Sequence, residues 1–403
     1  MNKRGLMIII ISALCLISLA QAEEKEDTKI EPKLVYEKRF DFEIEQGKIG
    51  EDGSIFPTIF VTKDNRILFF DKNSNIRKEI SFACPGNIVK LSEDGKYVII
   101  AHFLQKSVTE FTATNFEIYD SNGKIIVNKV IENVRPSDIL LTRDANAIIL
   151  FQDDSETMPW GISFYDGKLN LLREYRNDDF KLTCVPGSHW RNPGYNYAWL
   201  NKNSRFLVGT GSNRGIWGLY VFDVCGTLKY YEHFDSLVIG KAMVSNDGNL
   251  LCAILFKYFG YARKINDGVS KLIIWDNHKI ADTKVLSNET KGSEFLRTHI
   301  AISEGNHFLA FAYFDTIFLY ETQLSKLHRI CNLGITHPHV LDCSERGDIL
   351  LAGDSGYIMM IDNNGETLIK TQLEGTILDG TLSREDISII SSRGAFILKK
   401  GAQ

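Results

Sequence analysis

The sequence predicts an all-β protein, a β-propeller of four-stranded blades, because two signals recur together along the chain. Apolar strands that end in an acid followed by a turn occur at Asp71, Asp120, Asp166, Asp223, Asp276, Glu321 and Asp362. Ahead of each acid, apart from the first, a short polar turn such as SEDGKYVIIA leads into another apolar strand. A repeat of roughly 40–50 residues that holds several short strands is typical of propeller blades, whose sheets bury their faces against their neighbours.

Each repeated acid marks a β-hairpin between the third strand and the outermost strand of a blade. The stretch FEIYDSNGKII, residues 116–126, shows the pattern most clearly, with apolar residues on both sides of an Asn-Gly turn. Short acidic side chains accept hydrogen bonds from backbone amides in such turns, so we expect these acids to cap turns rather than to catalyse.

The two ends of the chain predict how the ring closes. The segment GEDGSIFPTIFV resembles a degenerate first repeat, and the last repeat stops after AFILKKGAQ without an outermost strand. Residues 33–40, KLVYEKRF, have the composition to supply that strand. Pairing the N-terminal strand beside the C-terminal one would remove the exposed edges. Eight blades are therefore predicted, or seven if the first repeat is not a full sheet.

The N-terminus has the pattern of a signal peptide. Lys3 and Arg4 precede an apolar run that is shorter than the roughly 20 residues of a membrane-spanning helix, and Ala20-Gln21-Ala22 follows it. We therefore expect residues 1–22 to be cleaved near Ala22. Residues 23–403 would then be a single propeller domain, periplasmic or secreted, with no transmembrane segment in the mature chain.

Composition excludes some classes of partner. With 46 basic and 51 acidic residues the formal net charge is −5, and no loop concentrates Lys and Arg, so nucleic acid is not expected as a ligand. The cysteines have irregular spacing without a CxxC pair, which gives no zinc pattern. They are expected to form one or two incidental disulfides or to be buried thiols.

The repeats resemble two known families. The turns at Asp120–Gly123, Asp223–Gly226 and Asp362–Gly365 are similar to the DxxG turns of PQQ-like propellers, whereas Trp275-Asp276 and SEDGKYV are similar to WD40-like bacterial repeats. The resemblance covers nearly all of the mature chain and implies the propeller fold. The Trp usual after a PQQ-like DxxG is replaced by Val127, Tyr230 and Ile369, so we expect no cofactor.

Long segments are predicted on one face of the propeller, which we call the top face. This face carries the loops between blades and those that join second strands to third strands. The long, irregular segments are 103–115, 152–161, 177–196 and 257–270, and all four belong to it. They carry Trp160, Trp190, Arg191 and Tyr261, and aromatic and Arg side chains are enriched where proteins bind partners. These aromatics could instead pin their own loops to the blades.

A second candidate site lies along the innermost strands. Each of these strands ends at a Ser, Thr or Asn, namely Ser92, Thr142, Asn201, Ser245, Ser303, Ser344 and Ser383. Four places before these residues stand Ile88, Asp138, Tyr197, Lys241, His299, Val340 and Asp379. We expect this mostly polar set near the top mouth of the central channel, either as a ligand site or as a water-filled mouth of compensating charges. His337 and His339 could chelate a metal, but no carboxylate or Cys pattern accompanies them.

These observations favour an exported, non-enzymatic, monomeric propeller that binds a protein or glycan through its top face, and they assign no catalytic residue and no metal ligand. The alternatives are a metal-assisted lyase or hydrolase that uses the channel mouth, and a structural scaffold in an envelope assembly. No nucleophile elbow, phosphate loop or HExxH helix is present in the sequence.

Overall fold

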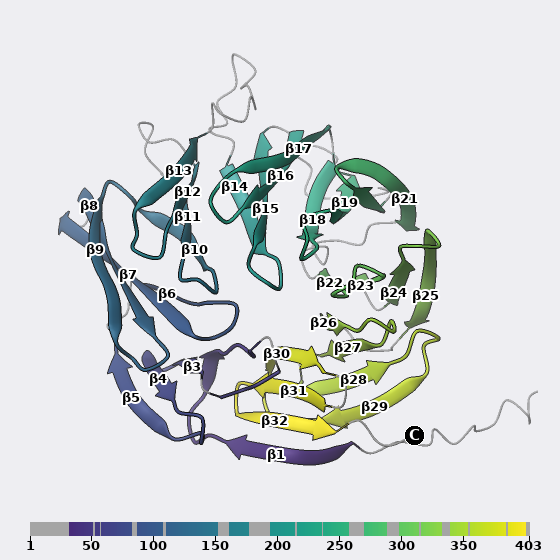
Figure 1. The fold of residues 1–403 in the computed structure, drawn as a ribbon, viewed down its shortest axis with the longest axis horizontal. Coiled ribbons are helices and arrows are strands. Elements are labelled where there is room, and N and C mark those ends of the chain that lie inside the picture. Colours follow the sequence, from purple (N-terminus) through teal and green to yellow (C-terminus); the bar gives the residue numbers. More distant parts are fainter. Residues whose placement is uncertain are drawn as a thin grey trace, which may run out of the picture.

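The fold is an eight-bladed β-propeller. The computed structural model describes residues 32–50, 53–56, 58–82, 87–107, 110–151, 161–176, 194–213, 216–235, 237–257, 270–287, 298–313, 316–332, 339–353, 355–383 and 386–399. These residues form eight antiparallel sheets of four strands each, arranged around a common axis (Figure 1). The prediction of eight blades is confirmed.

The first three blades follow one another in sequence, each with its first strand innermost. Blade 1 comprises β2 (Ile44–Gln46), β3 (Ile59–Thr62), β4 (Arg66–Phe70) and β5 (Ile76–Ser81). Blade 2 comprises β6 (Ile88–Leu91), β7 (Tyr97–Ser107), β8 (Glu110–Asp120) and β9 (Ile125–Glu132). Blade 3 comprises β10 (Pro136–Leu141), β11 (Ala147–Phe151), β12 (Gly161–Tyr165) and β13 (Leu171–Arg176).

The next three blades repeat this order. Blade 4 comprises β14 (Gly194–Leu200), β15 (Phe206–Asn213), β16 (Ile216–Asp223) and β17 (Leu228–Asp235). Blade 5 comprises β18 (Leu237–Val244), β19 (Leu250–Lys257), β20 (Ser270–Asp276) and β21 (Lys279–Ser287). Blade 6 comprises β22 (His299–Ile302), β23 (Phe308–Tyr313), β24 (Thr316–Glu321) and β25 (Lys326–Asn332).

The last two blades close the ring. Blade 7 comprises β26 (His339–Cys343), β27 (Ile349–Ala352), β28 (Tyr357–Ile361) and β29 (Thr367–Gln372). Blade 8 comprises β30 (Ile377–Leu382), β31 (Asp386–Ser391), β32 (Gly394–Lys399) and, as its outermost strand, β1 (Lys33–Arg39). Strand β1 pairs antiparallel with β32 from Lys33↔Lys399 to Arg39↔Gly394, as the missing last strand predicted.

Aromatic side chains reinforce this closure. The chain leaves β1 through Phe40, whose amide donates to the carbonyl of Arg393 at 3.0 Å. The Phe40 ring then packs edge-on against Phe60 and Phe70 of blade 1, each with ring centroids 5.5 Å apart. Edge-to-face aromatic pairs add to the stability gained from burial alone. The segment after β1 therefore joins blade 8 to blade 1 through side chains as well as through the backbone.

The short turns on the bottom face are held by their own side chains. In five of the seven outer hairpins the acid accepts backbone amides as predicted, at Asp71, Asp120, Asp166, Asp223 and Asp362. Asp120, for example, accepts those of Asn122 and Lys124, both at 2.9 Å. At the ends of the innermost strands the predicted Ser, Thr or Asn has the same use. The Ser92 hydroxyl accepts the amide of Tyr97 at 3.0 Å. In these turns the polar side chains accept hydrogen bonds from nearby backbone amides. This explains why an acid recurs in the outer hairpins and a Ser, Thr or Asn at the ends of the innermost strands.

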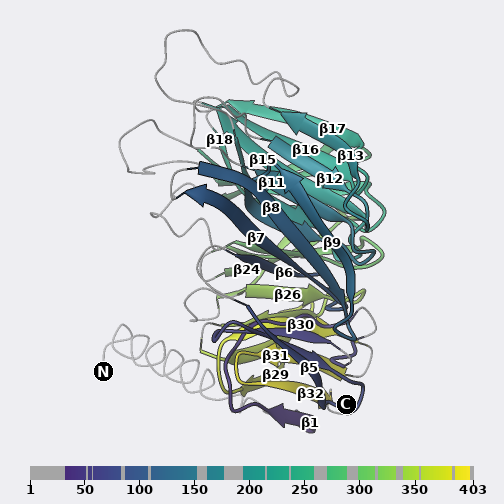
Figure 2. The same cartoon turned by 90° about the vertical axis from the view of Figure 1, so that its left-hand side faces the viewer.

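Blade 2 has a long hairpin on the top face where the sequence predicted an irregular loop. That prediction is wrong for residues 103–115, because β7 and β8 are each 11 residues long and stay paired to Ser107↔Glu110. In Figure 2 the two strands extend beyond their neighbours toward the left-hand side. The other three predicted segments lie almost entirely outside the described residues. Within the described part of the chain there is no helix, and hence none that could span a membrane.

Candidate functional site

A cavity of about 360 Å³ lies in the central channel and contains three of the predicted residues. Lys241 on β18, His299 on β22 and Asp379 on β30 all line it. Asp138 on β10 is not among the lining residues, and its carboxylate pairs with Lys90 of the neighbouring blade at 2.8 Å. Of Tyr197 only the backbone in β14 is described. Trp160, Trp190, Arg191, Tyr261 and His337 lie outside the described residues, so these predictions stay untested.

A β-bulge precedes this register in several innermost strands. The pairing shifts between Pro136 and Asp138, between Ile239 and Lys241, and between Ile377 and Asp379. A bulge inserts one extra residue and increases the local twist, which changes the direction in which the next side chain points. The polar residue four places before the strand end therefore follows a kink, whereas the rest of the strand pairs regularly.

A second set of channel residues, which was not predicted from the sequence, lies two places before each strand end. Residues two apart on a strand share a face, so this register also points into the channel. Its members that line the cavity are Leu140, Trp199, Met243, Ala301, Asp342 and Thr381. Side chains alternate between the two faces of a strand, so the residues two places after the predicted channel set could have been identified from the sequence by the same alternation.

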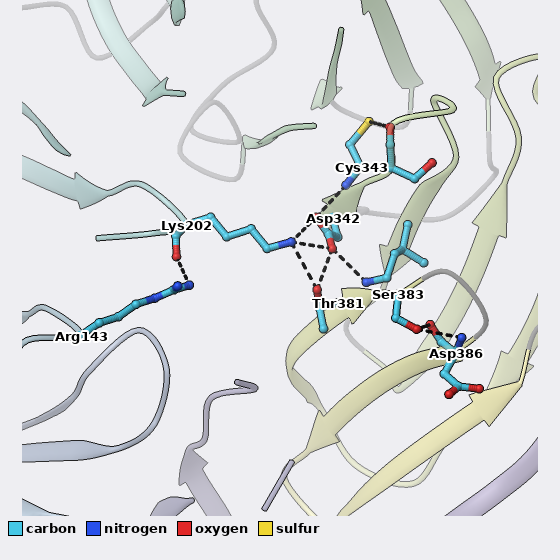
Figure 3. Close-up of polar contacts among 9 residues, drawn as sticks. Arg143, Lys202, Asp342, Cys343, Thr381, Ser383 and Asp386 are labelled. Atoms are coloured by element: carbon cyan, nitrogen blue, oxygen red, sulfur yellow. Dashed lines mark hydrogen bonds and ion pairs between the residues drawn. The ribbon is translucent and has the colours of Figure 1, made fainter. Parts of the chain in front are cut away.

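An ion pair crosses the bottom end of the channel. Lys202 follows β14 in blade 4, and its ammonium contacts both carboxylate oxygens of Asp342 in blade 7 at 2.9 Å (Figure 3). Asp342 is buried and also accepts hydrogen bonds from the Thr381 hydroxyl at 2.7 Å and from the Leu382 amide at 2.9 Å. Blades 5 and 6 lie between the two partners in the ring. The pair therefore narrows the channel toward the bottom face.

A second ion pair lies on another part of the cavity wall. Lys48 contacts Glu93 at 3.1 Å, and this carboxylate raises the pKa of Lys48. Asp379 accepts the backbone amide of Ile49 at 2.9 Å. Burial raises the pKa of Asp379, and the nearby Lys48 opposes that shift. Asp379 therefore lies close to a cation that Glu93 already binds.

Lys241 has a different environment from the other cavity lysines. Its ammonium lies 4.6 Å from the centroid of the Trp199 ring, and the described residues offer it no carboxylate or hydrogen-bond acceptor within contact distance. Burial lowers the pKa of Lys241 to about 8, although the charge of Glu93 acts in the opposite direction. A cation over an aromatic face gains some stabilisation, but less than a paired ammonium does.

Two histidines meet beside the cavity. His339 Nδ1 lies 2.5 Å from His299 Nε2, with the ring centroids 4.2 Å apart. One of the two nitrogens must carry a proton and the other a lone pair in such a contact. Among the described residues, no group of three or more His, Cys, Asp or Glu side chains is placed to hold a metal ion.

Three cysteines in the described part of the chain are free thiols. They are Cys225, which is exposed, and Cys252 and Cys343, which are buried.

Comparison with known proteins supports the fold and nothing finer. No protein-family model matches the sequence, and no curated protein does. Among solved structures, the chain is similar to BamB from Moraxella catarrhalis, with a TM-score of 0.54 and 12% identity over 91% of this chain and 99% of that one. It is also similar to the C-terminal WD40 domain of Sif2, with a TM-score of 0.51 and 11% identity over 93% of this chain and 99% of that one. At these identities the likeness establishes that the chain has the fold of the β-propeller repeat proteins, the class that its WD40-like and PQQ-like repeats resemble.

Proposed function

We propose that this chain is an exported, non-enzymatic binding protein that holds a protein or glycan partner on its top face. The observation that carries the proposal is the asymmetry between the two faces. Bottom turns are short and use their polar side chains to bind their own backbone, as at Ser92 and Asp120. The top face carries the long β7–β8 hairpin. Lengthening a surface segment costs little stability, and segments that a rigid scaffold holds in place commonly carry binding residues. The long hairpin therefore favours the top face as the binding surface.

Export is proposed from the charged start, the apolar run and Ala20-Gln21-Ala22 in the sequence. The likeness to BamB and to the WD40 domain of Sif2 establishes only the fold, so the partner class is proposed from this chain's own residues.

Alanine substitution of the two top-face tryptophans tests the proposal. Once a partner has been isolated by affinity capture or identified on a glycan array, Trp160→Ala or Trp190→Ala should weaken binding by about 2 kcal/mol or more, because aromatic anchors dominate interface energies. The melting temperature should change little. Asp120→Ala in a bottom turn is the control and should leave the affinity unchanged. Normal binding by both Trp variants, together with loss of binding in Asp120→Ala at unchanged stability, would place the working face on the opposite side.

A further inference from the structure

Lys241 is the one cavity lysine whose charge the described residues leave without an anion. The ammonium of Lys48 is 3.1 Å from Glu93, and that of Lys202 is 2.9 Å from Asp342. Arg143 donates to the carbonyl of Lys202 (Figure 3). For the Lys241 ammonium, the described part of the chain offers the Trp199 ring, 4.6 Å from its centroid, and no ion pair. Burying an ammonium without an anionic partner costs free energy, so a Lys in this position favours a site at which an anion binds.

The carboxyl groups of the cavity are already engaged. Glu93 binds Lys48, and Asp342 binds Lys202, the Thr381 hydroxyl and the Leu382 amide. Asp379 accepts the Ile49 amide and lies near Lys48. The charge of Glu93 reaches Lys241, but the described residues place no carboxylate in contact with its ammonium, and Glu93 already binds Lys48. Among the described lining residues, four cationic side chains therefore face three carboxyl groups.

The cavity also has room for an apolar group beside this charge. Its volume of about 360 Å³ lies within the range of small-molecule sites, roughly 300–1,000 Å³. Trp199, Met243, Leu140 and Leu341 supply apolar wall on several blades. Small-molecule sites typically combine such walls with a few placed polar groups.

We propose that the channel cavity binds a small organic carboxylate, with Lys241 neutralising the carboxylate and the Trp199 side of the cavity holding the apolar part. This site is distinct from the surface proposed for a protein or glycan partner and does not depend on it. The His299–His339 contact lies on the cavity's edge, where His299 also lines the wall.

Benzoate and its neutral analogue benzamide are the probes that test this site. In calorimetric or NMR titration of the mature chain at pH 7, benzoate should bind at least about tenfold more tightly than benzamide, since only benzoate can neutralise Lys241. Lys241→Met should lose about tenfold or more of the benzoate affinity. Lys90→Met is the matched control, because Lys90 also lies on an innermost strand but pairs with Asp138 outside the cavity.

Stability and pH supply an independent readout of the same lysine. The pKa of Lys241 is lowered to about 8 from 10.5, so folding carries the full penalty of the buried charge below pH 8 and none above about pH 10.5. Lys241→Met should thus melt several degrees higher than wild type at pH 7, and the difference should shrink between pH 8 and 10.5. Benzoate affinity should fall as the pH rises through about 8, since the ammonium is lost.

Three results would each overturn the proposal. They are no benzoate binding at millimolar concentration, equal binding of benzamide, and undiminished benzoate binding by folded Lys241→Met. A Lys241→Met variant that melts below wild type at pH 7 would also contradict it, because that result would mean that the ammonium already has a stabilising partner.

Discussion

A mature chain that starts at Phe40 instead of Glu23 is expected to lose its cooperative melting transition or to aggregate. Strand β1 pairs with β32 over six residue pairs and is the outermost strand of blade 8. Each backbone hydrogen bond contributes a net of about 0.5–1.5 kcal/mol, so loss of the ladder costs several kcal/mol. That is a large part of the stability of a typical domain. The edge of β32 would also become available to other chains.

The control for this deletion is a chain that starts at Pro32, which removes residues 23–31 and keeps β1. Calorimetry and size-exclusion chromatography of the two forms give the comparison. We expect the control to melt and elute like the chain that starts at Glu23. A chain that starts at Phe40 and behaves identically would show that β1 contributes nothing to closure and that the ring is held by the blade contacts alone.

Asp342→Ala is expected to produce the largest loss of stability among single substitutions in the channel. The buried carboxylate accepts from Lys202, Thr381 and the Leu382 amide, so its removal leaves these partly buried donors without that acceptor. Breaking a buried ion pair typically costs about 3–5 kcal/mol. Because the Lys202 side chain is 49% exposed, we expect about 3 kcal/mol for Asp342→Ala and less for Lys202→Met.

A double-mutant cycle separates the ion pair from the other contacts of Asp342. Urea unfolding of Lys202→Met, Asp342→Ala and the double variant gives the coupling energy between the two side chains. The matched control is the exposed pair Lys63–Glu43, for which the coupling should be close to zero. Zero coupling between Lys202 and Asp342, or wild-type stability of Asp342→Ala, would show that this pair does not fasten blade 4 to blade 7.

The propeller and its closure could be predicted from the sequence because their signals are local and repeated. The acid at Asp120 and the hydroxyl at Ser92 recur in most blades, since each blade must turn its chain in the same way. The missing outermost strand of the last blade left a single unpaired position, which residues 33–40 could fill. Because the blade is repeated, the sequence contains several independent copies of one structural unit. Counting the strands of the last copy showed that one was missing, which predicted that the N-terminal strand closes the ring.

The channel could be predicted only in part, because its contacts depend on ring geometry. The register that contains Lys241 and Asp379 was visible as an alternation along each strand. The contact between Lys202 and Asp342 was not, since it joins blades that are separated by two others. The β7–β8 hairpin was also missed. Leu104 in this hairpin is 40% exposed, so this apolar residue does not mark a buried face, which is the main signal by which strands are recognised in a sequence.

Photo-cross-linking from the two faces of blade 2 tests most directly the claim that the top face binds the partner. The photoreactive residue p-benzoylphenylalanine would replace Leu104, near the top end of β7, or Ile125, which follows the bottom turn of the same blade. Both side chains are similarly exposed, at 40% and 45%, so exposure alone predicts equal labelling. In cells that export the protein, we expect a discrete cross-linked species from position 104 and none from position 125. The same species from position 125, with none from position 104, would contradict the account.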